Sequence, residues 1–162
     1  MDDRSATPAG PSGDTGEAPA EPSAEVLAEL DRLDAASRAA VGEIAPQIAL
    51  WRAVAALDHW VFIDRGDGEH PRPYALAAEP GTMLCVFSTA DRATAAAIGA
   101  GLVTGGEPVR MFAIPLPAAL DFVLSFAAAG AVGVTIDHPQ IGAWSPLQNI
   151  AMLRQERRGE DG

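Results

Sequence analysis

Short apolar runs alternate with amphipathic segments along most of this chain, and the alternation predicts strands and helices in turn. The clearest case is the stretch 82–101. It begins with the unbroken apolar run 83–87, which is typical of a strand covered on both faces. Ser88 then precedes Asp91 by three positions, the spacing of a helix capping box, and the Ala-rich segment 90–100 predicts a helix. A strand that leads directly into a helix is typical of an α/β layer.

The same patterns continue on both sides of this stretch. Apolar residues at helical spacing predict three more helices, over 23–44 with Ser23 as its N-cap, 47–58 and 116–129. A capping box at 145–148, with Pro146 at the first helical position, predicts a fourth over 145–158. Runs of β-branched and aromatic residues predict four more strands, at 60–64, 73–78, 109–114 and 132–136. An Asp-Gly turn between the first two of these strands predicts that they pair as an antiparallel hairpin. The expected fold is therefore α/β, with a mixed sheet of about five strands and helices packed on it.

Composition divides the chain into three segments. Residues 1–22 are rich in Pro, Gly, Ala and acidic residues, which predicts a disordered tail. Residues 23–44 form the predicted amphipathic helix, and residues 46–158 form the predicted α/β domain. The narrow apolar stripe of the first helix consists of Val26, Leu30 and Leu33. This stripe has two interpretations, because it could pack on its own domain or dock on a partner protein or a second copy.

Charge and cysteine content exclude several classes of partner and cofactor. The chain has 22 acidic and 11 basic residues and a formal net charge of -11, which disfavours nucleic acid and anionic membranes as partners. Its single cysteine, Cys85, excludes an intrachain disulfide and a Cys-based zinc cluster, and its apolar neighbours predict a core residue. No Gly-rich phosphate loop is present. We therefore expect no cofactor and no bound metal.

Two features bear on cellular location. The N-terminal residues lack the basic and apolar character of a signal segment, so we expect a cytoplasmic protein. The most hydrophobic window, 118–136, contains Asp121 and is interrupted by Gly130 and Gly133. We interpret it as a helix, a turn and a strand inside a core, and expect no membrane span.

Polar residues follow two of the predicted strands. Ser88, Thr89 and Asp91 come after the run 83–87, and Asp137 and His138 come after the strand at 132–136. Open α/β sheets bind ligands at the carboxyl ends of their strands, so these residues are candidates for a small-molecule or catalytic site. In that case His138 could act as a base oriented by a carboxylate. The alternative interpretation is a capped helix start and a solvated Asp-His-Pro corner.

The segment 47–155 contains four short motifs: Leu-Trp-Arg-Ala-Val at 50–54, Val-Phe-Ile at 61–63, Leu-Cys-Val-Phe-Ser-Thr at 84–89 and Gly-Val-Thr-Ile-Asp-His-Pro at 133–139. In these motifs the segment resembles the SseB N-terminal-domain family of bacterial proteins. Two departures stand out: the order of Ser and Thr after Phe87 is inverted, and Asp137 and His138 stand where the family tends to show Asn. The resemblance implies an α/β domain. It implies very little about activity, because the family is not tied to an established reaction.

Three functions are compatible with these observations. The first is a non-enzymatic protein-interaction or regulatory module, which follows from the lack of a paired catalytic constellation and from an acidic surface that would attract a partner with a basic patch. The second is a ligand-binding or enzymatic site around Ser88 and His138. The third is a structural subunit that forms homo-oligomers through the first helix or an edge strand.

Overall fold

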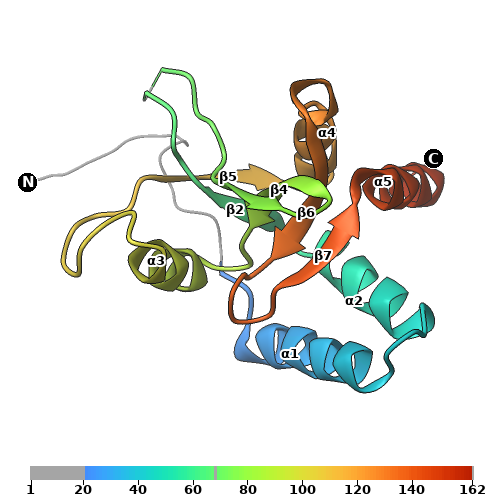
Figure 1. The fold of residues 1–162 in the computed structure, drawn as a ribbon. Coiled ribbons are helices and arrows are strands. Elements are labelled where there is room, and N and C mark those ends of the chain that lie inside the picture. Colours follow the sequence, from blue (N-terminus) through green and yellow to red (C-terminus); the bar gives the residue numbers. More distant parts are fainter. Residues whose placement is uncertain (1–20, 68, 162) are drawn as a thin grey trace, which may run out of the picture.

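The computed structural model describes residues 21–67 and 69–161, so almost all of the predicted tail at 1–22 lies outside the described residues. Within them the chain is α/β (Figure 1). The helices are α1 (Ala24–Ala39), α2 (Ala45–Ala55), α3 (Ala90–Gly99), α4 (Ala118–Leu124) and α5 (Leu147–Asp161), with a 3-10 turn η2 (Ala127–Ala129). The strands are β2 (His59–Ile63), β3 (Ala75–Ala78), β4 (Gly81–Val86), β5 (Met111–Pro115), β6 (Ala131–Ile136) and β7 (Ala143–Pro146).

The strands form two sheets rather than the single mixed sheet that we expected. One sheet has the order β3-β4-β6-β7, in which β4 and β6 are parallel and the outer pairs are antiparallel. The other consists of β2 and β5, paired antiparallel. Backbone hydrogen bonds join the sheets at two places. Val61 and Phe87 exchange two hydrogen bonds of 2.9 Å, and Tyr74 donates its N–H to the Ile63 carbonyl of β2 while its carbonyl accepts from the Cys85 N–H of β4. In Figure 1 the helix α3 lies to one side of the strands, α4 and α5 to the other, and α1 and α2 below.

The predicted hairpin between 60–64 and 73–78 forms only at its loop end, where Tyr74 donates its N–H to the Ile63 carbonyl. All five residues of β2 are buried, and its whole length pairs with β5, while only Asp64 and Pro73 bridge to the returning segment. The intervening polar loop is held locally, since one carboxylate oxygen of Asp64 accepts hydrogen bonds from the backbone N–H groups of Gly66 (2.7 Å) and Arg72 (3.1 Å). The segment after this loop forms β3, which pairs antiparallel with the next strand, β4. Burial of β2 on both faces thus outweighs the local turn signal.

The predicted helix start at 145–148 is also wrong by one residue, because the capping box predicts Pro146 as the first helical residue. Ser145 and Pro146 belong to β7, and the helix begins at Leu147. Ser145 is buried and pairs with Val134 of β6. Strand pairing at the edge of the sheet therefore takes Ser145, the residue that would have capped the helix.

Two apolar clusters hold the elements together. The larger lies between the strands and the helices α2, α4 and α5, with Trp60 and Phe62 fully buried near its middle. The indole N–H of Trp60 donates to the carbonyl of Val54 at 2.9 Å, so the one polar atom of this side chain is satisfied. The smaller cluster lies under α3 and includes Cys85, which confirms the prediction that this cysteine is a core residue.

Candidate functional site

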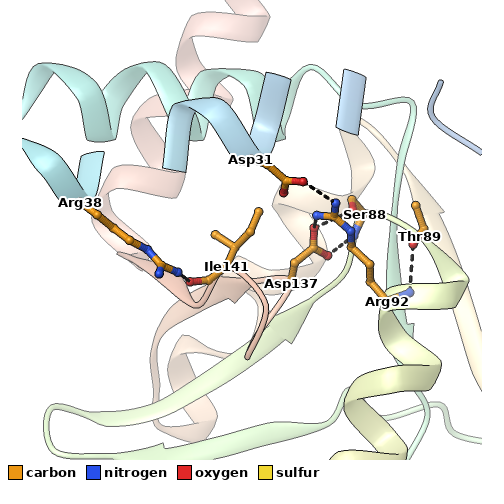
Figure 2. A network of polar contacts seen from close by, with 7 residues as sticks. All are labelled: Asp31, Arg38, Ser88, Thr89, Arg92, Asp137 and Ile141. Carbon is orange, nitrogen blue, oxygen red and sulfur yellow. Dashed lines mark hydrogen bonds and ion pairs between the residues drawn. The ribbon is translucent and has the colours of Figure 1, made fainter. Parts of the chain in front are cut away.

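The candidate site lies where β4 and β6 end side by side. The two strands are parallel and in register at Val86 and Ile136, so the residues that follow them meet at one edge of the sheet. Ser88 and Asp137 are both buried there, with exposed fractions of 0% and 1%. The Ser88 hydroxyl donates to Asp137 Oδ2 at 2.6 Å, and the Ser88 backbone N–H donates to Asp137 Oδ1 at 2.7 Å (Figure 2). The structure therefore brings together two of the residues that the sequence singled out.

Arg92 of α3 completes this arrangement, and the sequence did not point to it. One guanidinium nitrogen donates to Asp137 Oδ2 at 2.7 Å, and the other donates to Asp31 Oδ2 on α1 at 3.0 Å (Figure 2). Burial acts to lower the pKa of Arg92, but its hydrogen bonds to Asp31 and Asp137 and their negative charges outweigh this effect and raise the pKa above its ordinary value. We refer to Asp31, Ser88, Arg92 and Asp137 as the polar network.

Thr89, not Ser88, caps the helix that follows. The Thr89 side-chain oxygen accepts a hydrogen bond from the backbone N–H of Arg92 at 3.0 Å, as an N-cap residue does. The prediction that Ser88 forms the capping box with Asp91 is therefore wrong, because the Ser88 hydroxyl is directed to Asp137 instead. Asp91 lies in the first turn of α3, where its charge favours the positive helix end, and it is exposed and outside the polar network.

The structure does not join His138 to this network. His138 is half-buried, and its imidazole makes no hydrogen bond to Ser88 or Asp137. Asp137 has a positive φ of 50°, a conformation that Asp tolerates better than most residues. Its backbone is fixed on both sides, since its N–H donates to the Val86 carbonyl and its carbonyl accepts from the Ile141 N–H. The Asp137 carboxylate is thus occupied by Ser88 and Arg92, and it does not orient His138.

Helix α1 covers this edge of the sheet. Ser23 caps the helix as predicted, since its hydroxyl accepts from the Val26 N–H at 3.2 Å. Leu30 is fully buried and Leu33 partly buried, whereas Val26 is 41% exposed. Near its C-terminal end, the Arg38 side chain pairs with Asp34 at 3.0 Å and donates to the Ile141 carbonyl (Figure 2). The stripe of α1 therefore packs on its own domain through Leu30 and leaves Val26 accessible.

The hydrogen bonds and ion pairs of the polar network are typical of a structural contact between elements. Each oxygen of the buried Asp137 carboxylate accepts a hydrogen bond from Ser88, and Arg92 neutralises its charge, which is what a buried carboxylate requires. A catalytic serine would need a base that removes its proton and an open path for the substrate. Here the proton of Ser88 is directed to a carboxylate that already carries an ion pair, beneath a helix.

The described residues lack two other features. Within residues 21–67 and 69–161 no three His, Cys, Asp or Glu side chains are grouped so that they could hold a metal ion. No helix in the same part of the chain combines the length and the apolar character that crossing a membrane needs.

No protein-family model, curated protein or solved structure matches this chain. The resemblance to the SseB N-terminal-domain family stays a prediction.

Proposed function

We propose that this protein acts as a non-enzymatic protein-interaction module. The observation that carries the proposal is the distribution of exposed apolar side chains. Five of the seven large apolar residues that are exposed in the described part of the chain belong to one region around α2. They are Val41, Ile44, Ile48, Trp144 and Met152, and we call them the α2 face. Exposed apolar side chains that gather in one region of a surface are typical of protein-binding sites.

Helix geometry and two contacts support this grouping for four of the five residues. Ile44 and Ile48 are one helical turn apart, and Trp51 on the same side of α2 lines a groove that also contains Trp144. On the other flank, Arg52 pairs with Glu156 of α5 at 3.2 Å. Arg52 lies one turn beyond Ile48 and Glu156 one turn beyond Met152, so each of these apolar residues lies one helical turn from the ion pair.

A different protein fits the α2 face better than a second copy of this chain. The formal net charge of -11 makes two copies repel each other, and it attracts a partner that surrounds an apolar surface with basic residues. The polar network supports the same function indirectly, because it fills the edge of the sheet where a ligand would bind an open α/β fold.

The test is affinity capture of the tagged full-length chain from its native lysate, with mass spectrometry of the captured proteins. Two matched variants accompany the wild type. Ile48→Glu places a charge in the α2 face, and Ile98→Glu places the same charge on α3, at a residue of similar exposure (40% and 44%). The proposal predicts a stoichiometric partner that Ile98→Glu retains and Ile48→Glu loses, because a charged rim or core residue weakens apolar docking.

Two outcomes would contradict the proposal. Capture of no stoichiometric protein by the wild type would remove it, and so would equal retention of the partner by both variants. A third outcome would change the identity of the partner. If size-exclusion chromatography with light scattering showed a concentration-dependent dimer that Ile48→Glu abolishes, the α2 face would be a contact between copies of this chain.

A further inference from the structure

A second surface, between α1 and the segment that joins α2 to β2, has a chemistry of its own. The structure has a groove there of about 590 Å³, within the size range of natural ligand pockets. Its floor is apolar and consists of Val26, Leu30, Ala53, Ala56 and Leu57. Val26 and Leu30 belong to the stripe of α1 that the sequence marked as a possible docking surface. The exposure of Val26 follows from this groove, which no other described element fills.

The rim of this groove is acidic. Its four carboxylates are Glu21, Glu25, Glu29 and Asp58. Two are partly occupied: Glu29 pairs with Arg32 on the same helix, and Glu21 accepts a hydrogen bond of 3.3 Å from the backbone N–H of Ala90. Glu25 and Asp58 pair with none of the basic side chains that the structure describes. The rim therefore has at least two carboxylates with which a basic ligand could pair.

His59 forms a polar part of the groove wall. It lies in the wall of the groove and is 5% exposed. Its backbone pairs with Pro115 of β5, which holds the residue in place. A ligand in the groove would therefore meet an imidazole beside the acidic rim.

We propose that this acidic groove binds a basic amphipathic peptide segment of another protein. An apolar side chain of the segment lies on the floor beside Val26, and a Lys or Arg next to it pairs with Glu25 and Asp58. Nucleic acid and a second copy of this chain carry the wrong charge for the rim. The inference names one kind of partner for an interaction module, and in that sense it rests on the proposed function, but it uses different side chains of α2 from the α2 face.

The test is fluorescence anisotropy with the full-length chain and two short fluorescein-labelled peptides. In the first peptide Leu and Lys recur at helical spacing, and in the second every Lys is replaced by Glu. The binding variant is Glu25→Gln/Asp58→Asn, which removes two charges from the rim without changing side-chain size. Its matched control is Glu43→Gln/Glu79→Gln, which removes the same net charge at exposed residues outside the groove. A further variant, Ala56→Trp, fills the groove from an exposed residue.

The inference predicts a clear order of affinities. The wild type binds the Lys peptide, and it does not bind the Glu peptide. Glu25→Gln/Asp58→Asn raises the Kd for the Lys peptide about tenfold, the control raises it less than about twofold, and Ala56→Trp weakens binding by more than about tenfold. Ile48→Glu leaves the Kd unchanged, so failure of this groove and failure of the α2 face are separable.

Three results would overturn the inference. They are no binding of the Lys peptide by the wild type, equal weakening by the two double variants, and unchanged binding by Ala56→Trp. The second of these would mean that the overall negative charge attracts the peptide without a specific site. Near-ultraviolet circular dichroism of each variant shows that a loss of binding does not reflect loss of the fold.

Discussion

The Ser88 hydroxyl lies 2.6 Å from Asp137 Oδ2, although 49 positions separate the two residues in the chain. Together with the hydrogen bond from the Ser88 backbone N–H to Asp137 Oδ1, this contact ties the ends of the parallel strands β4 and β6 to each other. Arg92 extends the connection to α3 and, through Asp31, to α1. One buried carboxylate therefore holds two strand ends and two helices in a fixed relation.

The first prediction concerns the charge balance of this carboxylate. Replacing Arg92 with Met keeps much of the side-chain volume but leaves the buried Asp137 without its ion-pair partner. Removing one partner of a buried ion pair typically costs about 3–5 kcal/mol, and we expect Arg92→Met to lower the free energy of unfolding by this amount. Equilibrium unfolding in urea measures the change.

Asp31→Asn is the control for this prediction. Asp31 contacts the same guanidinium, but its side chain is about half exposed, and exposed ion pairs contribute less than about 1 kcal/mol. The loss for Asp31→Asn should therefore be several-fold smaller than the loss for Arg92→Met. Equal losses for the two variants would show that the contact with α1, and not the buried carboxylate, determines the effect.

The sequence predicted those parts of the fold that depend on neighbouring residues. The Ser23 cap is confirmed, and the predicted helix at 90–100 agrees with the observed Ala90–Gly99, because capping and helix propensity act within a few positions. The choice between Ser88 and Thr89 as the next cap was wrong for a non-local reason. Asp137 takes the Ser88 hydroxyl, and it approaches only when β6 pairs with β4.

The same distinction explains the other errors. β2 has a local turn signal toward 73–78 but pairs with β5, and Ser145 has a local cap signal but pairs with β6. Arg92 and Asp31 had no signal at all, because nothing in the spacing of either residue identifies an ion pair that forms across two helices. The sequence therefore identified only part of the candidate site. It predicted the strand-end residues Ser88 and Asp137, but it did not predict Arg92 and Asp31, which extend the site from two helices.

The second prediction concerns the close packing of β6 against β7. A Cβ atom at Gly133 would lie 2.6 Å from the backbone oxygen of Ser145 and 3.0 Å from atoms of Met83 and Trp144. Because the nearest atom belongs to the backbone, the strands must shift to accept Gly133→Ala, and we expect a loss of about 1–3 kcal/mol in the free energy of unfolding. Thermal unfolding followed by circular dichroism measures it.

Gly105→Ala serves as the matched substitution. A Cβ at Gly105 would have no neighbour within 4 Å, so this variant should be neutral or slightly stabilising, within about 1 kcal/mol. If Gly133→Ala were as stable as Gly105→Ala, the strands β6 and β7 would be less closely packed than the structure indicates.

The third prediction concerns the reactivity of Cys85. Burial raises the pKa of its thiol to about 11, and the side chain is 1% exposed. At pH 8 the folded protein should therefore react with a thiol reagent only after unfolding, and urea should accelerate the reaction to the rate of a free cysteine. Rapid stoichiometric labelling of the native protein would show that this strand opens readily.

The raised pKa of Cys85 also has a consequence for stability. The folded thiol ionises less readily than the unfolded one, so its contribution to stability is fully present below a pH of about 9 and disappears as the pH rises toward about 11. Cys85→Ala lacks this ionisation. The free energy of unfolding of the wild type should therefore fall more steeply over this pH range than that of Cys85→Ala, and parallel curves would contradict the assignment.

The last prediction tests whether Ser88 is a nucleophile. Its hydroxyl is 0% exposed and donates to a carboxylate that already pairs with Arg92, so no neighbouring base is positioned to activate it. We expect a fluorophosphonate probe to leave the folded protein unmodified, as measured by intact-protein mass spectrometry alongside a serine hydrolase as positive control. A stoichiometric adduct that maps to Ser88 and disappears in Ser88→Ala would establish the opposite, because only an accessible and activated serine reacts in this way. In that case α1 would have to move away from the strand ends, and the enzymatic interpretation would replace the interaction module.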